Sequence, residues 1–339
     1  MKFLVTGGAG FIGSAFIRML LGTKDGARSS QVINLDKLTY AGNLENLQSV
    51  AGDPRYCFVQ GDICDAKLVD ALVADARPDV IVNFAAESHV DRSILSPGPV
   101  IETNIRGTFT LLEAARTYKT PRFLHVSTDE VYGSIEPPHD AVESDPLRPS
   151  SPYSASKAGS DLLVLSYFVT FHMPVLVTRA SNNYGPYQFP EKLIPLMISN
   201  ALDGNPLPIY GDGMQIRDWL FVDDHCRAIL GAIERGREGE VYNIGGSRAL
   251  PNVEVVKKIL NAVDQPLSLM RTVTDRPGHD LRYALSSEKL IRETGWNAVT
   301  PFEEGLQLTI DWYRGNPEWI ARVRSGEYQN FYDRNYADR

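Results

Sequence analysis

The sequence predicts an α/β fold in which a doubly wound parallel sheet is followed by a smaller α/β C-terminal lobe. Short apolar segments alternate with longer segments of helical spacing through the first half of the chain, as in parallel sheets covered by helices. A glycine-rich segment follows the first apolar segment, and the strict alternation loosens from Glu191 onward. Ligands of such sheets bind beyond the carboxyl ends of the strands, so functional residues are expected there.

The composition limits the classes of protein to which the chain can belong. Its 339 residues can bury a large core, as one large domain or two closely packed ones. The net charge of -8 argues against nucleic acids and anionic membranes as partners. Cys57, Cys64 and Cys226 lack paired spacing, so we expect reduced thiols in the cytoplasm and no metal site. The chain enters a strand directly, which leaves no room for a signal peptide, and no apolar segment approaches the roughly 20 residues that span a bilayer.

The first strand, Lys2–Thr6, leads into a loop with glycines at positions 8, 10 and 13, in the pattern G-x-G-x-x-G. The loop opens a helix, and small residues there let the backbone approach a pyrophosphate at the helix N-terminus. A second strand, Gln31–Leu35, ends at Asp36, where an acid accepts ribose hydroxyls and repels a 2′-phosphate. The pattern favours NAD over NADP. The alternative is a tight turn with a helix-capping aspartate.

Two further strands are expected at Tyr56–Gln60 and Val80–Phe84. The first ends near Asp62 and Ile63, which could hold the adenine edge. The second ends in small residues, Ala85 and Ala86, which again suggest close approach of a cofactor. A long helix, from about Val100 to Tyr118, is expected to follow and includes Thr103.

The apolar strand Phe123–Val126 precedes Thr128, Asp129 and Glu130, which are therefore expected where chemistry occurs. Tyr153 and Lys157 are four residues apart on a predicted helix, so both side chains face one side. A cation beside a phenol lowers the phenol pKa and makes a usable general base. The alternative for Asp129 and Glu130 is that they only cap a helix or solvate a loop. The alternative for Tyr153 and Lys157 is an amphipathic helix whose lysine faces solvent.

In the second half, a strand at Val175–Thr178 precedes Asn182 and Asn183, which are either ligands or ordinary turn formers. His225 and Cys226 lie together but lack further ligands at metal spacing, so we interpret them as structural. The remaining expected elements are a helix from Glu191, a strand at Leu207–Gly211, a helix at Asp223–Glu234, a strand at Val241–Ile244, and helices at Pro251–Val263 and Phe302–Tyr313.

Two motifs resemble the extended short-chain dehydrogenase/reductases: residues 6–13 and Tyr153-Ser154-Ala155-Ser156-Lys157. Epimerases, dehydratases and decarboxylases of nucleotide sugars share both motifs. Other segments, taken together, are similar to the dTDP-glucose 4,6-dehydratase branch of that family. They are residues 127–133, 38–43, 86–93, 181–187 and 276–280 and the aromatic tail Tyr328–Tyr336. The resemblance covers essentially the whole chain, and its one visible departure is the polar segment Thr23–Ser30, expected to be a surface loop.

The resemblance implies a Rossmann-like NAD-binding domain at residues 1–180. Residues 181–339 would mainly form a nucleotide-sugar-binding lobe, with some segments possible in the Rossmann sheet. It further implies a hydro-lyase of deoxysugar biosynthesis, such as rhamnose biosynthesis, that converts dTDP-glucose to dTDP-4-keto-6-deoxyglucose. Oxidation of C4 makes the C5 proton acidic, water leaves from C5 and C6, and the hydride returns to C6.

The resemblance assigns Tyr153 as the base at the C4 hydroxyl, Glu130 as the base at C5 and Asp129 as the acid at the C6 hydroxyl. Lys157 would bind the nicotinamide ribose and lower the pKa of Tyr153, and Thr128 would hydrogen-bond the sugar at C4. A homodimer is also implied. Lys192, Arg217 and Arg276 are expected around the diphosphate, since arginine supplies the bidentate geometry that phosphates prefer.

The residues expected to bind NAD are Gly7, Gly10, Phe11, Ile12, Gly13, Asp36, Lys37, Leu38, Thr39, Gly42, Asp62, Ile63, Phe84, Ala85, Ala86, Ser88, Thr103, Tyr153, Lys157 and Asn183. Those expected to bind substrate are Ser88, Thr128, Asn182, Glu191, Lys192, Leu193, Pro208, Tyr210, Arg217, Asn252, Arg276 and His279. Three other functions stay open: UDP-glucose dehydration, 4-epimerisation, and a non-catalytic NAD-binding scaffold. The Asp129-Glu130 pair argues against epimerisation, and the intact acid–base set argues against a scaffold.

Overall fold

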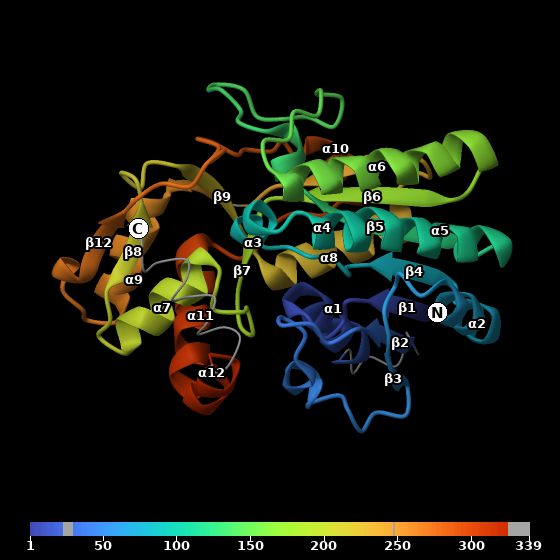
Figure 1. Ribbon diagram of the computed structural model, residues 1–339, viewed down its shortest axis with the longest axis horizontal. Helices are drawn as coiled ribbons and strands as arrows, with labels where there is room; N and C mark the ends of the chain where they lie inside the picture. The colour runs from blue at the N-terminus through green and yellow to red at the C-terminus, as the bar shows by residue number, and fades with distance from the viewer. Residues whose placement is uncertain (23–29, 247, 325–339) are drawn as a thin grey trace.

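The computed structural model describes residues 1–22, 30–246 and 248–324. The predicted loop Thr23–Ser30, apart from Ser30, and the aromatic tail Tyr328–Tyr336 lie outside the described residues. Figure 1 shows a large sheet covered by helices and, at the left, a smaller lobe that carries β8, β12, α7, α9, α11 and α12. In the described part of the chain, no helix has both the length and the apolar character needed to cross a membrane.

The larger lobe contains a seven-stranded parallel sheet in the order β10-β6-β5-β4-β1-β2-β3, so the predicted fold class is confirmed. The order reverses between β1 and β4, and the crevice at such a reversal is where ligands bind. The strands are β1 (Lys2–Thr6), β2 (Gln31–Asp36), β3 (Tyr56–Gln60), β4 (Val80–Asn83), β5 (Arg122–Thr128), β6 (Val175–Ala180) and β10 (Val241–Ile244).

Helices cover both faces of this sheet because successive strand residues point to opposite sides. Phe3 and Val5 of β1 pack into a core shared with α1 (Phe11–Gly22) and α8 (Val222–Arg235). Leu4 lies between them in sequence and packs on the other face, with α2 (Ala66–Ala76), α5 (Thr108–Thr117) and α6 (Pro152–Phe171). α10 (Glu288–Thr294) returns from the C-terminal half to pack on α8 and β10.

The helix predicted from Val100 to Tyr118 is not a uniform α-helix. It consists of a short turn, α4 (Gly98–Val100), a π-helical segment, η2 (Ile101–Gly107), and α5. Asn104 in η2 accepts the Glu87 N–H at 2.9 Å and donates to Ser156 Oγ at 2.8 Å. Such π-segments are often found at functional sites, and this one ties the end of β4 to α6.

The smaller lobe is built from short strands and amphipathic helices around its own core. β7 (Asn182–Tyr184), β9 (Ile216–Phe221) and β11 (Arg248–Pro251) form one sheet, and β8 (Leu207–Tyr210) pairs with β12 (Met270–Val273). The sequence predicted β8 but not the other four strands. The helices are α7 (Leu193–Leu202), α9 (Asn252–Ala262), α11 (Phe302–Gly315) and α12 (Pro317–Val323). The remaining elements are η1 (Leu44–Leu47), α3 (Val90–Leu95), η3 (Asp129–Tyr132) and η4 (Leu267–Leu269).

Candidate active site

A cavity of about 340 Å³ lies at the carboxyl ends of the strands. The ends of β1, β2, β4, β5 and β6 form its wall on one side, together with Tyr153 and Lys157 of α6. The segment from Gln188 to Ile194 and Trp219, which belong to the core or flanks of the smaller lobe, form the other side. The cavity therefore lies where the two lobes meet.

The glycine-rich loop forms one wall, and its shape depends on the absence of side chains. Gly7 has φ +70°, and a Cβ there would lie 2.6 Å from Ala85 N at the end of β4. A Cβ at Gly13 would lie 2.4 Å from Gly7 O, so only glycine lets α1 approach the loop this closely. This strand–turn–helix geometry presents the N-terminus of α1 to the cavity, which suits a pyrophosphate.

Asp36 lies at the end of β2, as predicted, and is almost fully buried. Its carboxylate accepts the N–H groups of Ala9 and Leu38, each at 2.8 Å. Burial raises the pKa of Asp36, and the two backbone donors oppose that rise. Next to it, Lys37 forms an ion pair with Asp62 at 2.7 Å. An acid at this position fits the hydroxyls of an adenosine ribose.

All residues predicted to bind the cofactor lie in the cavity wall except Leu38. Leu38 adopts a left-handed conformation, with φ 56°, and its backbone contacts Asp36 instead. The wall also contains buried polar atoms without a hydrogen-bond partner among the described residues, which suits a ligand that carries several polar groups. Among these atoms are Asn182 Oδ1, Gln188 Oε1, Trp219 Nε1 and His225 Nε2. The donor and acceptor set therefore fits a dinucleotide cofactor.

Thr128, Asp129 and Glu130 lie at the other end of the cavity, where β5 passes directly into η3. Thr128 Oγ1 accepts the Glu130 N–H at 3.3 Å and donates to Asp129 Oδ1 at 3.1 Å. This cap turns both carboxylates into the cavity wall immediately after the strand.

The two carboxyl groups have different surroundings. Burial and the Glu130 charge raise the pKa of Asp129 well above its ordinary value. Burial also raises the pKa of Glu130, but Arg276, Lys192 and Arg217 oppose that rise. Asp129 is therefore set to hold its proton, while Glu130 is supported as an anion by three cations.

Tyr153 and Lys157 lie one turn apart at the start of α6. Ser151 caps this helix by accepting the Ser154 N–H at 3.1 Å, and Pro152 occupies its first turn. Lys157 Nζ donates to Val126 O at 2.7 Å, and burial lowers its pKa to about 8.

The predicted lowering of the Tyr153 pKa by Lys157 is wrong for the chain as the structure describes it. Burial and the nearby charges of Glu130 and Asp129 raise the pKa of Tyr153. The Lys157 ammonium is directed at the Val126 carbonyl of β5 instead. A hydrogen bond to the Thr128 hydroxyl acts in the lowering direction on Tyr153.

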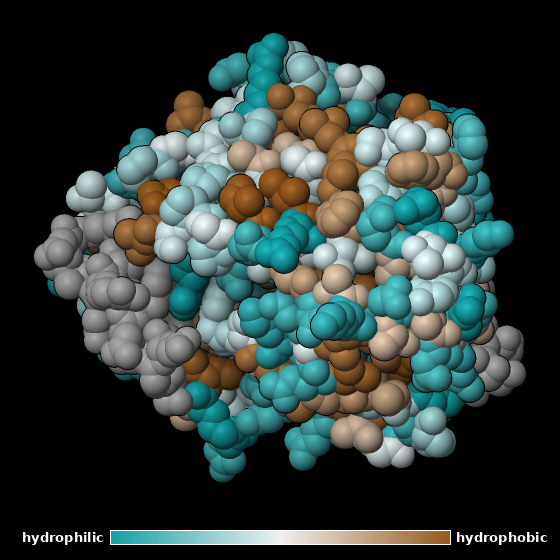
Figure 2. Space-filling view, turned by 45° about the vertical axis from the view of Figure 1, so that its right-hand side comes forward, coloured by the Kyte–Doolittle hydropathy of each residue, from teal (hydrophilic) through white to brown (hydrophobic). Residues whose placement is uncertain are grey.

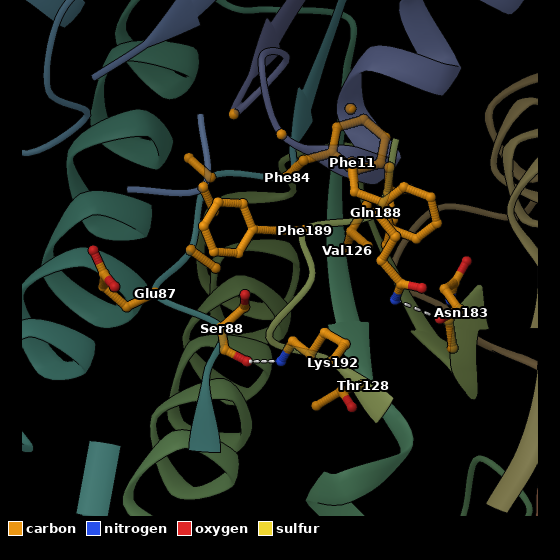
Figure 3. A pocket seen from close by; sticks show the side chains of 18 of the residues that line it. Phe11, Phe84, Glu87, Ser88, Val126, Thr128, Asn183, Gln188, Phe189 and Lys192 are labelled. Atoms are coloured by element: carbon orange, nitrogen blue, oxygen red, sulfur yellow. Dashed lines mark hydrogen bonds between the residues drawn. The ribbon is translucent and has the colours of Figure 1, made fainter. Parts of the chain in front are cut away.

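The smaller lobe contributes a segment that crosses the cavity. Figure 3 shows Lys192 donating to Ser88 O, at 2.6 Å, and Gln188 donating to Asn183 O, at 2.8 Å. Of the predicted substrate-binding residues, those in the cavity wall are Ser88, Thr128, Asn182, Glu191, Lys192 and Leu193.

The other predicted substrate-binding residues, Pro208, Tyr210, Arg217, Asn252, Arg276 and His279, do not lie in the cavity wall. Two of them, Arg217 and Arg276, nevertheless act electrostatically on Glu130 at the end of the cavity. Arg276 pairs with Asp91 at 3.2 Å, and the same carboxylate accepts the Tyr210 hydroxyl at 2.8 Å. Arg217 lies 4.2 Å from the Tyr283 ring centroid, and the Arg217 charge acts on both Asp129 and Glu130.

Sequence reasoning missed several residues of the wall, among them Gln188, Phe189, Trp219 and His225. His225 was interpreted as structural, yet its Nδ1 lies 2.8 Å from Asn183 Oδ1 in the wall. Burial lowers the pKa of His225 to about 3, so its ring is neutral. The sequence could not predict that His225 lies in the cavity wall, because a single histidine without metal-ligand spacing belongs to no recognisable motif. In the described part of the chain, no group of three or more His, Cys, Asp or Glu residues could hold a metal ion.

Comparison with known proteins gives consistent results. The family model described as GDP-mannose 4,6 dehydratase matches residues 4–309. A dTDP-glucose 4,6-dehydratase of Neisseria meningitidis serogroup B is 53% identical, with 97% of each chain covered. Another dTDP-glucose 4,6-dehydratase, from Shigella flexneri, is 49% identical, with 100% of each chain covered.

Solved structures agree with the curated relatives. The dTDP-glucose 4,6-dehydratase DesIV of Streptomyces venezuelae, solved with NAD and TYD bound, has a TM-score of 0.92 and 51% identity, covering 95% of this chain and 100% of that one. A Thermus thermophilus UDP-glucose 4-epimerase in complex with NAD has a TM-score of 0.85 and 32% identity, covering 93% and 99% of the two chains.

Proposed function

Because the chain belongs to the dTDP-glucose 4,6-dehydratase family of extended short-chain dehydrogenase/reductases, we propose that it dehydrates dTDP-glucose to dTDP-4-keto-6-deoxyglucose. The reaction would belong to deoxysugar biosynthesis, as in rhamnose formation. The observation that carries this proposal is the convergence of Asp129, Glu130 and Tyr153 on the cavity that also contains the glycine-rich loop.

NAD is the proposed cofactor, and relatives of this chain have been crystallised with it. The glycine-rich loop would hold its pyrophosphate, Asp36 its adenosine ribose, and Lys157 its nicotinamide ribose. When bound, NAD supplies a hydride acceptor for oxidation at C4 and returns that hydride to C6.

The protein's own groups would move three protons. Tyr153 takes the proton of the C4 hydroxyl, and Thr128, which acts to lower the Tyr153 pKa, stabilises the phenolate and hydrogen-bonds the sugar. Glu130 removes the C5 proton, made acidic by the ketone at C4. Asp129, whose raised pKa keeps it protonated, donates to the departing C6 hydroxyl.

Lys192, Arg217 and Arg276 are proposed to bind the diphosphate of the nucleotide sugar. Their positive charges already converge on Glu130, because all three oppose the rise of its pKa. Residues 181–339 would thus mainly bind the nucleotide sugar, while residues 1–180 would bind NAD. β10 and α10 of the second half pack with the large sheet rather than with the smaller lobe.

We also propose that the protein is a cytoplasmic homodimer. The outer faces of α5 and α6 expose large apolar side chains, including Phe109 at 46%, Leu162 at 60% and Val169 at 74%. Figure 2 shows apolar side chains exposed in several groups on one face of the molecule, including its upper part. Burying such a patch against a second copy stabilises association. Unpaired cysteines at all three positions suit a reducing compartment.

The purified protein should be incubated separately with dTDP-glucose and UDP-glucose while product mass is followed. We expect the dTDP sugar to lose one water without net formation of NADH. Turnover of UDP-glucose alone would retain the mechanism and change the substrate. A product of unchanged mass with inverted C4 would establish a 4-epimerase, the activity of the 32% identical structural relative. No turnover, even with added NAD, would favour the scaffold.

A further inference from the structure

Asn46, in η1, holds the backbone of the glycine-rich loop by a hydrogen bond. It is 2% exposed, and its Nδ2 donates to Ala9 O at 3.0 Å. The same carbonyl accepts the Asn43 N–H at 3.0 Å, and the Ala9 N–H donates to Asp36. Ala9 lies between Gly8 and Gly10, so Asn46 fixes the part of the loop proposed to approach the pyrophosphate.

The orientation of the Asn46 amide is set from the other lobe. Trp319 of α12 is 5% exposed, and its Nε1 donates to Asn46 Oδ1 at 3.1 Å. An amide whose oxygen is held by a donor must direct its NH₂ group to the other side, here to Ala9 O. A chain of buried hydrogen bonds therefore runs from Trp319 through Asn46 and Ala9 to Asp36.

Trp319 also packs near the segment that crosses the cavity. Its ring lies 6.3 Å from that of Tyr187, which itself lies 4.4 Å from Trp312. The guanidinium of Arg18, from α1, lies over the Tyr187 ring, at 4.2 Å from the ring centroid. Tyr187 adopts a left-handed conformation, with φ 66°, and directly precedes Gln188 of the cavity wall. The position of α12 therefore affects both the glycine-rich loop and the crossing segment.

We propose that Trp319 and Asn46 are positioning residues that couple the docking of the smaller lobe to the NAD-binding loop. The coupling rests on the proposed function, since it assumes that the loop binds NAD. When α12 is docked, the Trp319 indole fixes the Asn46 amide and the amide fixes Ala9. Without the indole N–H, the Asn46 amide can rotate, and the Asn43 N–H is then the only donor to Ala9 O whose direction is fixed. The loop is less ordered before NAD binds, so binding costs more conformational entropy.

The test compares NAD dissociation constants, measured on the full chain, for the wild type, Trp319→Phe and Trp312→Phe. Trp319→Phe keeps an aromatic ring in the cluster but removes the hydrogen-bond donor and the five-membered part of the indole, and Trp312→Phe removes the same atoms at a neighbouring position. Trp312→Phe is the matched control, because the described ring contacts of Trp312 are with Tyr187, Tyr313 and Trp319. We expect Trp319→Phe to bind NAD about tenfold more weakly, because NAD must then order the part of the loop that the Asn46 amide no longer fixes. Trp312→Phe should stay within about twofold of the wild type.

Two further measurements separate positioning from general stability. At saturating NAD, kcat of Trp319→Phe should return to the wild-type value, which a damaged fold would not allow. In an Asn46→Ala background, Trp319→Phe should cause no further loss of NAD affinity, because the indole would act through the amide. If Asn46→Ala does not fold, the comparison of the two tryptophan variants decides alone.

Equal NAD affinity of the two tryptophan variants, or additive losses in the double variant, would overturn the coupling while leaving the proposed function intact. A wild type that binds no NAD would overturn both.

Discussion

Asp129 and Glu130 are neighbours in the chain, yet different groups surround their carboxyls. Glu130 lies within reach of the charges of Arg276, Lys192 and Arg217. Asp129 is affected mainly by burial and by the Glu130 charge itself. Two carboxyls in such different surroundings can act as acid and base at the same pH. The motif alone could identify the pair but not this asymmetry, because the cations come from distant parts of the chain.

Asp129→Asn should separate oxidation from elimination. The amide cannot donate a carboxyl proton to the C6 hydroxyl, so dehydration should slow by about 10²–10⁴-fold. Oxidation at C4 should persist and be visible as transient NADH absorbance in a stopped-flow experiment. Glu130→Gln is the companion variant and should abolish exchange of the C5 proton with deuterated solvent. Normal dehydration by Asp129→Asn would show that another group is the acid.

Asp218 should make the stability of the fold depend on pH. Burial raises its pKa from 3.8 to about 6, although the Gly246 N–H, at 2.6 Å, opposes the rise. The folded protein therefore holds this proton more tightly than the unfolded chain between these pH values. The contribution of Asp218 to stability is fully present below about pH 4 and is lost as pH rises through about 6.

Asp218→Asn should remove that dependence. From pH 4 to pH 7.5, the free energy of unfolding of the variant should rise relative to the wild type, by about 3 kcal/mol at most. Urea denaturation of both proteins at the two pH values measures this difference. The same difference at both pH values would mean that Asp218 keeps its ordinary pKa in the folded state.

At the scale of elements, the parallel strands of the larger lobe were predictable because each is an apolar run bounded by turn residues. β1, β3 and β10 have the predicted bounds. The π-segment η2 was not predictable, because its apolar spacing is that of any helix and its wider turn depends on the contacts of Asn104 with Glu87 and Ser156. β7, β9, β11 and β12 were missed because they are short and become strands only through pairing with distant segments.

The exposed face of α5 and α6 should form the dimer interface. Val169→Asp places a charge at the most exposed of its large apolar side chains, so burial against a second copy becomes costly. We expect the variant to sediment as a monomer while the wild type sediments as a dimer. Val299→Asp is a matched control, because Val299 is 67% exposed and lies outside this face. A Val169→Asp variant that stays dimeric would place the interface elsewhere.

At the scale of the whole molecule, the prediction from sequence was most complete where the residues that act together are close together in the chain. The glycine-rich loop and the Tyr153-Lys157 pair each lie within a few residues and occupy the cavity wall. The smaller lobe was harder, because Arg217, Arg276 and Tyr210 come from separate elements and meet only after folding. Gln188, Trp219 and His225 carry no motif of their own, so their positions followed only from the structure.

Arg217→Glu tests whether the smaller lobe supplies charge to the substrate. Reversing a buried charge proposed to contact the diphosphate should raise KM for dTDP-glucose by about 10- to 100-fold or more. Arg248→Glu, on the neighbouring strand β11, is the control, because Arg248 is exposed and pairs with Glu303. Circular dichroism should first confirm that both variants fold. An unchanged KM for Arg217→Glu would remove this residue from the site.

The position of β10 has a consequence for synthesis of the protein. This strand completes the edge of the large sheet beside β6, but about 60 residues separate the two in the chain. At translation rates of about 5–20 residues per second, β6 would wait several seconds for its partner. During that interval the nascent chain exposes an unpaired strand edge, the feature through which chains aggregate. The parallel sheet is therefore completed only after β7, α7, β8 and β9 of the smaller lobe have been synthesised, so the two lobes fold over the same interval.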